Sequence, residues 1–84
     1  MVMELVERIE KIITDVLKIE PGTIKEISRD DTLNRIGVDS VNFIEIVISL
    51  EDEFNITFED EELLLQNLNT INKLKNVITQ KLES

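Results

Sequence analysis

The sequence predicts an all-α protein, a four-helix bundle with a short third helix and a long loop between the first and second helices. Apolar residues recur at spacings of three and four in three segments of the 84-residue chain, as in amphipathic helices. Residues 47–58 are rich in Ile, Val and Phe, but the alternation typical of a strand breaks at three consecutive acids. A chain of this length has room for one domain, so we expect residues 1–84 to fold as one unit.

The first helix is expected at residues 3–18, with one apolar stripe made of Leu5, Ile9, Ile12, Ile13, Val16 and Leu17. Residues 21–39 then form a long connection that mixes turn-forming residues with apolar ones. We expect this connection to fold back onto the helices. A connection of this length in so small a domain is often functional.

The second helix is expected at residues 40–54, and it is apolar on two faces. One face, expected in the core, carries Phe43, Ile46, Val47, Leu50 and Phe54. The other face carries Val41, Ile44 and Ile48. Because Glu45 and Asp52 lie beside these aliphatic residues, full burial is disfavoured and contact with a partner is favoured.

The third helix is expected to be short, at residues 59–66, with four acids in its first turn where the helix dipole favours them. The last helix is expected at residues 71–82. Its inward side chains are expected to be Leu74, Val77, Ile78 and Leu82.

The negative charge of the chain is concentrated in its centre. The net charge is −9, and residues 36–72 hold nine of the 18 acids without any Lys or Arg. This distribution disfavours nucleic acid as a partner, because phosphates attract basic surfaces. It favours docking onto basic protein surfaces, although a solvated surface that only maintains solubility also explains it.

The chain shows no secretory signal and no apolar run long enough for a membrane span. We therefore expect a cytoplasmic protein that does not bind a membrane. His and Cys are both absent, which excludes serine–histidine and cysteine–histidine catalysis and the usual zinc sites. A calcium loop starting at Asp30 fails, because Arg35 replaces the required Gly and Val41 the required Glu. We predict no catalytic residue, no metal site and no enzymatic activity.

The segment Gly37-Val38-Asp39-Ser40-Val41 stands where the second helix is expected to begin. Asp-Ser before an apolar helix is most often a helix cap. A capping box is not expected, because Asn42 lies three residues after Asp39 where the motif has Glu or Gln.

With the acidic, aliphatic helix that follows it, this segment resembles the acyl carrier protein family, whose motif is Gly-x-Asp-Ser-Leu/Val. The similarity continues through the acids at residues 59–62 and through Asn69-Thr70-Ile71 at the start of the last helix. It covers essentially the whole chain, including the long first loop. Residues 1–84 are therefore expected to be a single acyl-carrier-like domain.

The resemblance implies a covalent cofactor on Ser40. In this family a phosphopantetheinyl transferase, using Mg²⁺, moves 4′-phosphopantetheine from coenzyme A onto the matching serine, and the terminal thiol then carries acyl groups as thioesters. Asp39 is expected to cap the helix and to lie beside the metal-assisted transfer. Gly37 is expected to let the backbone turn into the site. A phosphodiester at a helix start also meets unpartnered N–H groups and the positive end of the dipole.

The resemblance also implies that the second helix docks onto basic patches of the transferase and of acyl-transferring and ketoacyl-synthase-type enzymes. Apolar contacts are expected from Val41, Ile44 and Ile48, and a charged rim from Glu45, Glu51 and Asp52. Asn42 departs from the family, in which this position is often acidic, so one contact for a basic transferase residue is removed. Ordinary exposed surface residues remain an alternative interpretation of this face.

Two functions are compatible with the sequence. The first is an acyl carrier of fatty-acid or polyketide-type biosynthesis, expected to be a monomer. A chain that starts with Met1 and ends just after the last helix favours a free-standing carrier. The second is an acidic helical interaction module without a prosthetic group.

Overall fold

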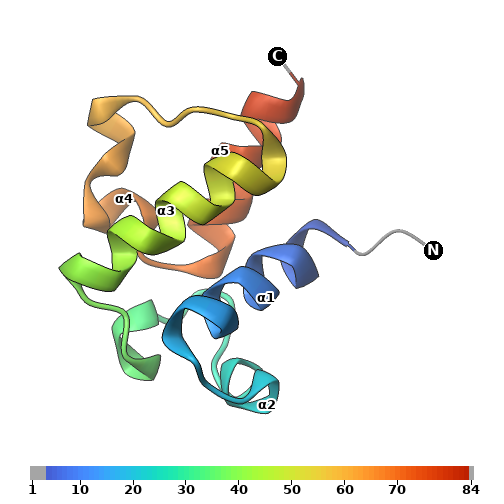
Figure 1. The fold of residues 1–84 in the computed structure, drawn as a ribbon, viewed down its shortest axis with the longest axis vertical. Coiled ribbons are helices and arrows are strands. Elements are labelled where there is room, and N and C mark those ends of the chain that lie inside the picture. Colours follow the sequence, from blue (N-terminus) through green and yellow to red (C-terminus); the bar gives the residue numbers. More distant parts are fainter. Residues whose placement is uncertain (1–3, 84) are drawn as a thin grey trace.

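A computed structural model describes residues 4–83, and all regular structure in that range is helical (Figure 1). This confirms the all-α class. The α-helices are α1 Leu5–Leu17, α2 Pro21–Ile24, α3 Ser40–Phe54, α4 Leu65–Leu68 and α5 Ile71–Glu83. Two short 3₁₀ helices are η1 Leu33–Ile36 and η2 Asp60–Leu63. The described residues therefore contain five α-helices, where four helices were expected.

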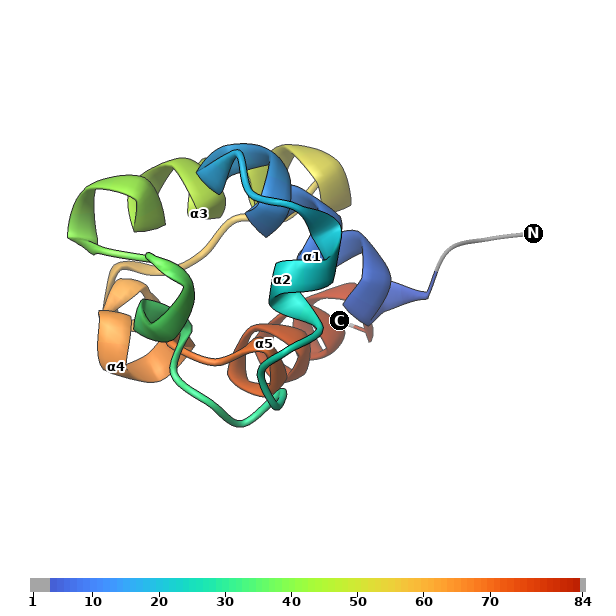
Figure 2. The same cartoon turned by 90° about the horizontal axis from the view of Figure 1, so that it is seen from below.

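The three long helices lie close to their expected positions. Helix α1 starts two residues later than expected and ends one residue earlier, although residue 3 lies outside the described residues. Helix α3 matches the expected range of 40–54, and α5 extends the expected range by one residue. Helix α1 packs against both α3 and α5, and Figure 2 shows α3 and α5 on opposite sides of the molecule. The expected second helix, which positions the candidate site, is thus α3.

The long connection after α1 folds back onto the helices, as expected. Ile24 of α2 and Leu33 of η1 are each only 1% exposed. The N–H of Leu33 donates to the carbonyl of Asn69 at 2.8 Å, and the N–H of Asn72 donates to the carbonyl of Arg29 at 3.0 Å. Buried side chains and backbone hydrogen bonds to the start of α5 therefore hold the connection that leads into α3.

The bounds expected for the third helix, residues 59–66, are wrong. The segment forms η2 and α4 instead, separated at Leu64, whose backbone is extended (φ −72°, ψ 129°). The start of η2 is capped by its own side chain, because the Glu62 carboxylate accepts the N–H of Glu59 at 2.7 Å. The same carboxylate pairs with Lys81 Nζ of α5 at 2.7 Å. Leu68 of α4 is fully buried and α4 packs against α5, so tertiary packing overrides the local preference for one continuous helix.

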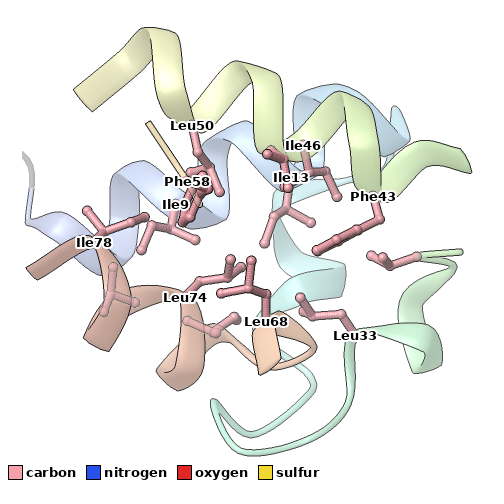
Figure 3. Close-up of a cluster of buried hydrophobic side chains, with 14 of the residues drawn as sticks. Ile9, Ile13, Leu33, Phe43, Ile46, Leu50, Phe58, Leu68, Leu74 and Ile78 are labelled. Carbon is pink, nitrogen blue, oxygen red and sulfur yellow. The ribbon is translucent and has the colours of Figure 1, made fainter. Parts of the chain in front are cut away.

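The core is built from aliphatic side chains and Phe that converge from the long helices and the connections (Figure 3). The face of α3 expected in the core is buried throughout, at Phe43, Ile46, Val47, Leu50 and Phe54. The inward position expected for Leu82 is wrong, because this side chain is 50% exposed. It lies in the last turn of α5, beyond Ile78, which is the last buried residue of that helix. Within residues 4–83, no helix combines the length and apolar character that a membrane span requires.

Candidate functional site

Ser40 is the first residue of α3, and its side chain is exposed. Among the described residues, neither its hydroxyl nor its backbone N–H has a hydrogen-bond partner. Because α3 is 15 residues long, its dipole places a partial positive charge at this end. The hydroxyl of Ser40 is thus accessible, unengaged and located where a negatively charged group is stabilised.

Asp39 caps α3. Its Oδ1 accepts the N–H of Val41 and the N–H of Asn42, both at 2.9 Å. Two of the N–H groups that a helix start leaves without partners are therefore satisfied by one carboxylate oxygen. The cap fixes the backbone on both sides of Ser40 and leaves the serine itself outside this hydrogen-bond pattern.

A capping box is present at α3, and the expectation that it is missing is wrong. Besides the bond from its own N–H to Asp39, Asn42 accepts the N–H of Asp39 through Oδ1 at 2.7 Å. An amide oxygen is the same acceptor in Asn as in Gln, and here the shorter side chain reaches the backbone. The rule used on the sequence was limited to Glu and Gln, so it missed this contact.

The side-chain amide of Asn42 also reaches back across the motif. Its Nδ2 donates to the carbonyl of Gly37 at 2.9 Å. Gly37 adopts φ +105°, a conformation that side chains disfavour and glycine accepts at no steric cost. Between these residues, Val38 is only 4% exposed and anchors the segment to the core. Gly37 thus makes the sharp turn that was expected of it.

The outward face of α3 carries the three aliphatic residues expected there. Val41 is 72% exposed, Ile44 59% and Ile48 53%. They recur at spacings of three and four, which places them along one side of the helix. The structure thus exposes these three aliphatic side chains along one side of α3, as the sequence predicted.

The acids expected to surround this face differ in their surroundings. Glu45 and Asp52 are exposed. Glu51 is half-buried, and its Oε2 accepts the N–H of Phe58 at 2.9 Å, which holds the segment after α3. The structure therefore brings Glu45 and Asp52 to the solvent side and gives Glu51 an internal partner.

The clearest electrostatic perturbation lies away from Ser40. The pKa of Glu62 is held below its ordinary value of 4.5, first by the hydrogen bond from Lys81 and then by that from the N–H of Glu59. Within the part of the chain that the structure describes, no cluster of three or more acidic side chains could hold a metal ion.

Comparisons with known proteins decide the family. Residues 7–78 match the family model described as phosphopantetheine attachment site. An acyl carrier protein of Petrotoga mobilis is 31% identical over 80 residues, which cover 94% of this chain and 88% of that protein. The chain belongs to the acyl carrier protein family. An acyl carrier protein of Cylindrotheca sp. is likewise 31% identical over 80 residues, covering 93% of this chain and 98% of that protein.

Membership of the acyl carrier protein family bears on two of the expectations. Acyl carrier proteins are carriers and not catalysts, so the expectation of a non-enzyme is confirmed. The family model also supports a phosphopantetheine prosthetic group. The residues at the start of α3 fit such a group: Ser40 offers an unengaged hydroxyl, and an exposed helix start suits a phosphodiester.

Proposed function

We propose that this acyl carrier protein carries 4′-phosphopantetheine on Ser40 and holds acyl intermediates as thioesters on it, in fatty-acid or polyketide-type biosynthesis. Residues 1–84 act as a single domain, a monomeric and free-standing carrier in the cytoplasm. We describe its fold as a four-helix bundle, in which the η2–α4 segment takes the place of the third helix and packs with α1, α3 and α5 around one core. The match spans 88% and 98% of the two relatives, so these relatives consist of little more than one such domain.

The observation that carries this proposal is the exposed hydroxyl of Ser40 at the first residue of α3, inside the region that matches the family model. A helix start lets a long arm project outward without disturbing the core. The buried face of the same helix keeps the start in place, because its side chains are locked into the core.

Attachment forms one bond and breaks one bond. The Ser40 oxygen bonds to the phosphorus next to pantetheine in coenzyme A, and the pyrophosphate bond breaks. Adenosine 3′,5′-bisphosphate leaves with the electron pair of that bond, and the hydroxyl proton goes to a base of the transferase or to solvent. Mg²⁺ is needed only for this transfer. The transferase would hold the ion, and Asp39 would lie beside it. Once attached, the group supplies a thiol that forms thioesters.

The docking surface of the carrier is the outward face of α3. Val41, Ile44 and Ile48 provide the apolar contacts. Glu45 and Asp52 provide the exposed charges that attract basic patches on the transferase and on acyl-transferring and ketoacyl-synthase-type enzymes. The carboxylate of Glu51 is less available for direct contact, because it is half-buried and already accepts the N–H of Phe58.

Intact mass measurement tests the attachment. The protein is incubated with coenzyme A, Mg²⁺ and a phosphopantetheinyl transferase of broad specificity. The wild type is expected to gain one phosphopantetheine group, and Ser40→Ala none. Ser49→Ala is the matched control, because Ser49 lies on the same helix and is half-buried; it should be modified like the wild type. A wild type that stays unmodified with several transferases contradicts the proposal and favours the interaction module.

A further inference from the structure

The turn that presents Ser40 is held by hydrogen bonds more than by packing. A Cβ added at Gly37 would meet nothing within 4 Å, so no neighbouring side chain packs against this position to hold its φ +105° conformation. Asp39 and Ser40 are both exposed. Val38 is buried and is the apolar anchor between Gly37 and Ser40. What fixes the exposed part of the turn must therefore be polar contacts.

Asn42 supplies two of these contacts from one side chain. Its Oδ1 accepts the N–H of Asp39 at 2.7 Å, and its Nδ2 donates to the carbonyl of Gly37 at 2.9 Å. The amide has only this orientation available, because the backbone N–H needs an acceptor and the carbonyl needs a donor. The side chain thus bridges Gly37 and Asp39, the two residues on either side of Val38. The two hydrogen bonds close a ring that includes the backbone leading to Ser40.

We infer that Asn42 is a positioning residue for transfer onto Ser40, one that holds the serine in the geometry for attack while docking depends on other residues. This inference rests on the proposed function. Transfer between two bound reactants is sensitive to alignment, and a displacement of about 1 Å can cost on the order of 100-fold in rate. A side chain that fixes the backbone before Ser40 should act on the rate of the bound complex.

In this chain a carboxylate at position 42 would keep only one of the two contacts that the amide makes. It would still accept the N–H of Asp39, but it has no proton to donate to the carbonyl of Gly37. Two oxygens would then face each other at a distance where the structure has a 2.9 Å hydrogen bond. At the same time, an added negative charge would strengthen attraction to a basic transferase. The substitution Asn42→Asp therefore separates positioning from simple charge, because the two effects have opposite signs.

The experiment measures kcat and KM of phosphopantetheine transfer, with coenzyme A saturating and the carrier as the varied substrate. For Asn42→Asp we expect KM to stay equal or fall, while kcat falls about tenfold. Asn42→Ala loses both contacts, and its kcat should fall at least as far, with KM within about twofold of the wild type. Asn76→Asp is the matched charge control, since Asn76 is exposed on α5; its kcat should be unchanged.

A second readout follows the ring itself without any transferase. In NMR spectra of the unmodified carrier, the side-chain NH₂ of Asn42 and the backbone N–H of Asp39 should exchange slowly. In Asn42→Asp the Asp39 N–H should keep its protection, because an acceptor remains. In Asn42→Ala this protection should be lost, while core amides of α3 stay protected and so report an intact fold.

The outcomes distinguish the inference from the function on which it rests. If the wild type is modified on Ser40 and Asn42→Asp has an equal or higher kcat, the inference is overturned and the proposed function stands. Fast exchange of the Asp39 N–H in the wild type overturns the inference in the same way. A wild type that is never modified overturns both.

Discussion

Replacing Asp39 by Ala tests whether its carboxylate holds the start of α3. The substitution removes the acceptor of two N–H groups, those of Val41 and Asn42, each bonded at 2.9 Å. Loss of such a cap costs about 1 kcal/mol, within a range of roughly 0.5–2 kcal/mol. In a domain of this size, about 1 kcal/mol lowers Tm by roughly 4–8 °C.

Asp39→Asn is the matched variant, because Asn is about as good a cap as Asp and differs mainly in charge. Thermal unfolding followed by circular dichroism should place this variant within a few degrees of the wild type. Phosphopantetheine transfer should nevertheless fall in Asp39→Asn, if the carboxylate lies beside the metal during transfer. An Asp39→Ala variant that melts with the wild type would refute the capping role. An Asp39→Asn variant that transfers at the wild-type rate would refute the second role.

Three other predictions follow from the core, the docking face and the acidic turn. Leu50→Ala removes a side chain that is 0% exposed and should cost about 2–5 kcal/mol in chemical denaturation, whereas Leu82→Ala, at a half-exposed site, should cost less than about 0.5 kcal/mol. Glu45→Lys should leave Tm nearly unchanged but weaken binding to a basic transferase, and the loss should shrink at high salt because exposed charges are screened. Lys81 holds the pKa of Glu62 below its ordinary value of 4.5. The stability that this pair adds is therefore present above pH 4.5 and is lost as pH falls through the folded pKa. In denaturation measured at several pH values, the difference in stability between the wild type and Glu62→Gln should vanish in acid.

The sequence predicted α3 and its two faces well, because periodicity alone determines which side of a helix is apolar. Phe43 and Leu50 were placed in the core, and Ile44 and Ile48 on the surface, by their spacing, and the structure agrees. The start of this helix was also predictable, since a Gly followed by Asp-Ser marks a turn and then a cap. These features are local, so no distant contact is needed to infer them.

The third helix was predicted less well, because its break depends on residues far away in the sequence. Glu and Leu are good helix formers, and residues 59–66 contain little else. Leu68 of α4 is buried against α5, and Glu62 contacts Lys81, which lies 19 positions further along the chain. No local sequence pattern predicts these contacts. The extended backbone at Leu64 that separates η2 from α4 could therefore not be read from periodicity.

The structure also divides the acids of α3 by what they do. Glu53 pairs with Arg8 of α1 at 2.7 Å, and the guanidinium of Arg8 lies 4.4 Å from the ring centre of Phe54. Glu51 is bonded to the backbone of Phe58. These two carboxylates have partners within the fold, and each tethers the C-terminal half of α3 to another segment.

The acids of α3 are therefore not equivalent for docking, because a carboxylate with a partner inside the fold is less available to a partner protein than a free one. On α3 the free acids are Glu45 and Asp52, which are exposed and lie in the same helix as the aliphatic residues of the outward face. The salt dependence of docking should accordingly follow these two residues. The acidic stretch in the sequence predicts that the partner's surface is basic. Only the contacts of each carboxylate in the structure show which of these charges are free to bind that surface.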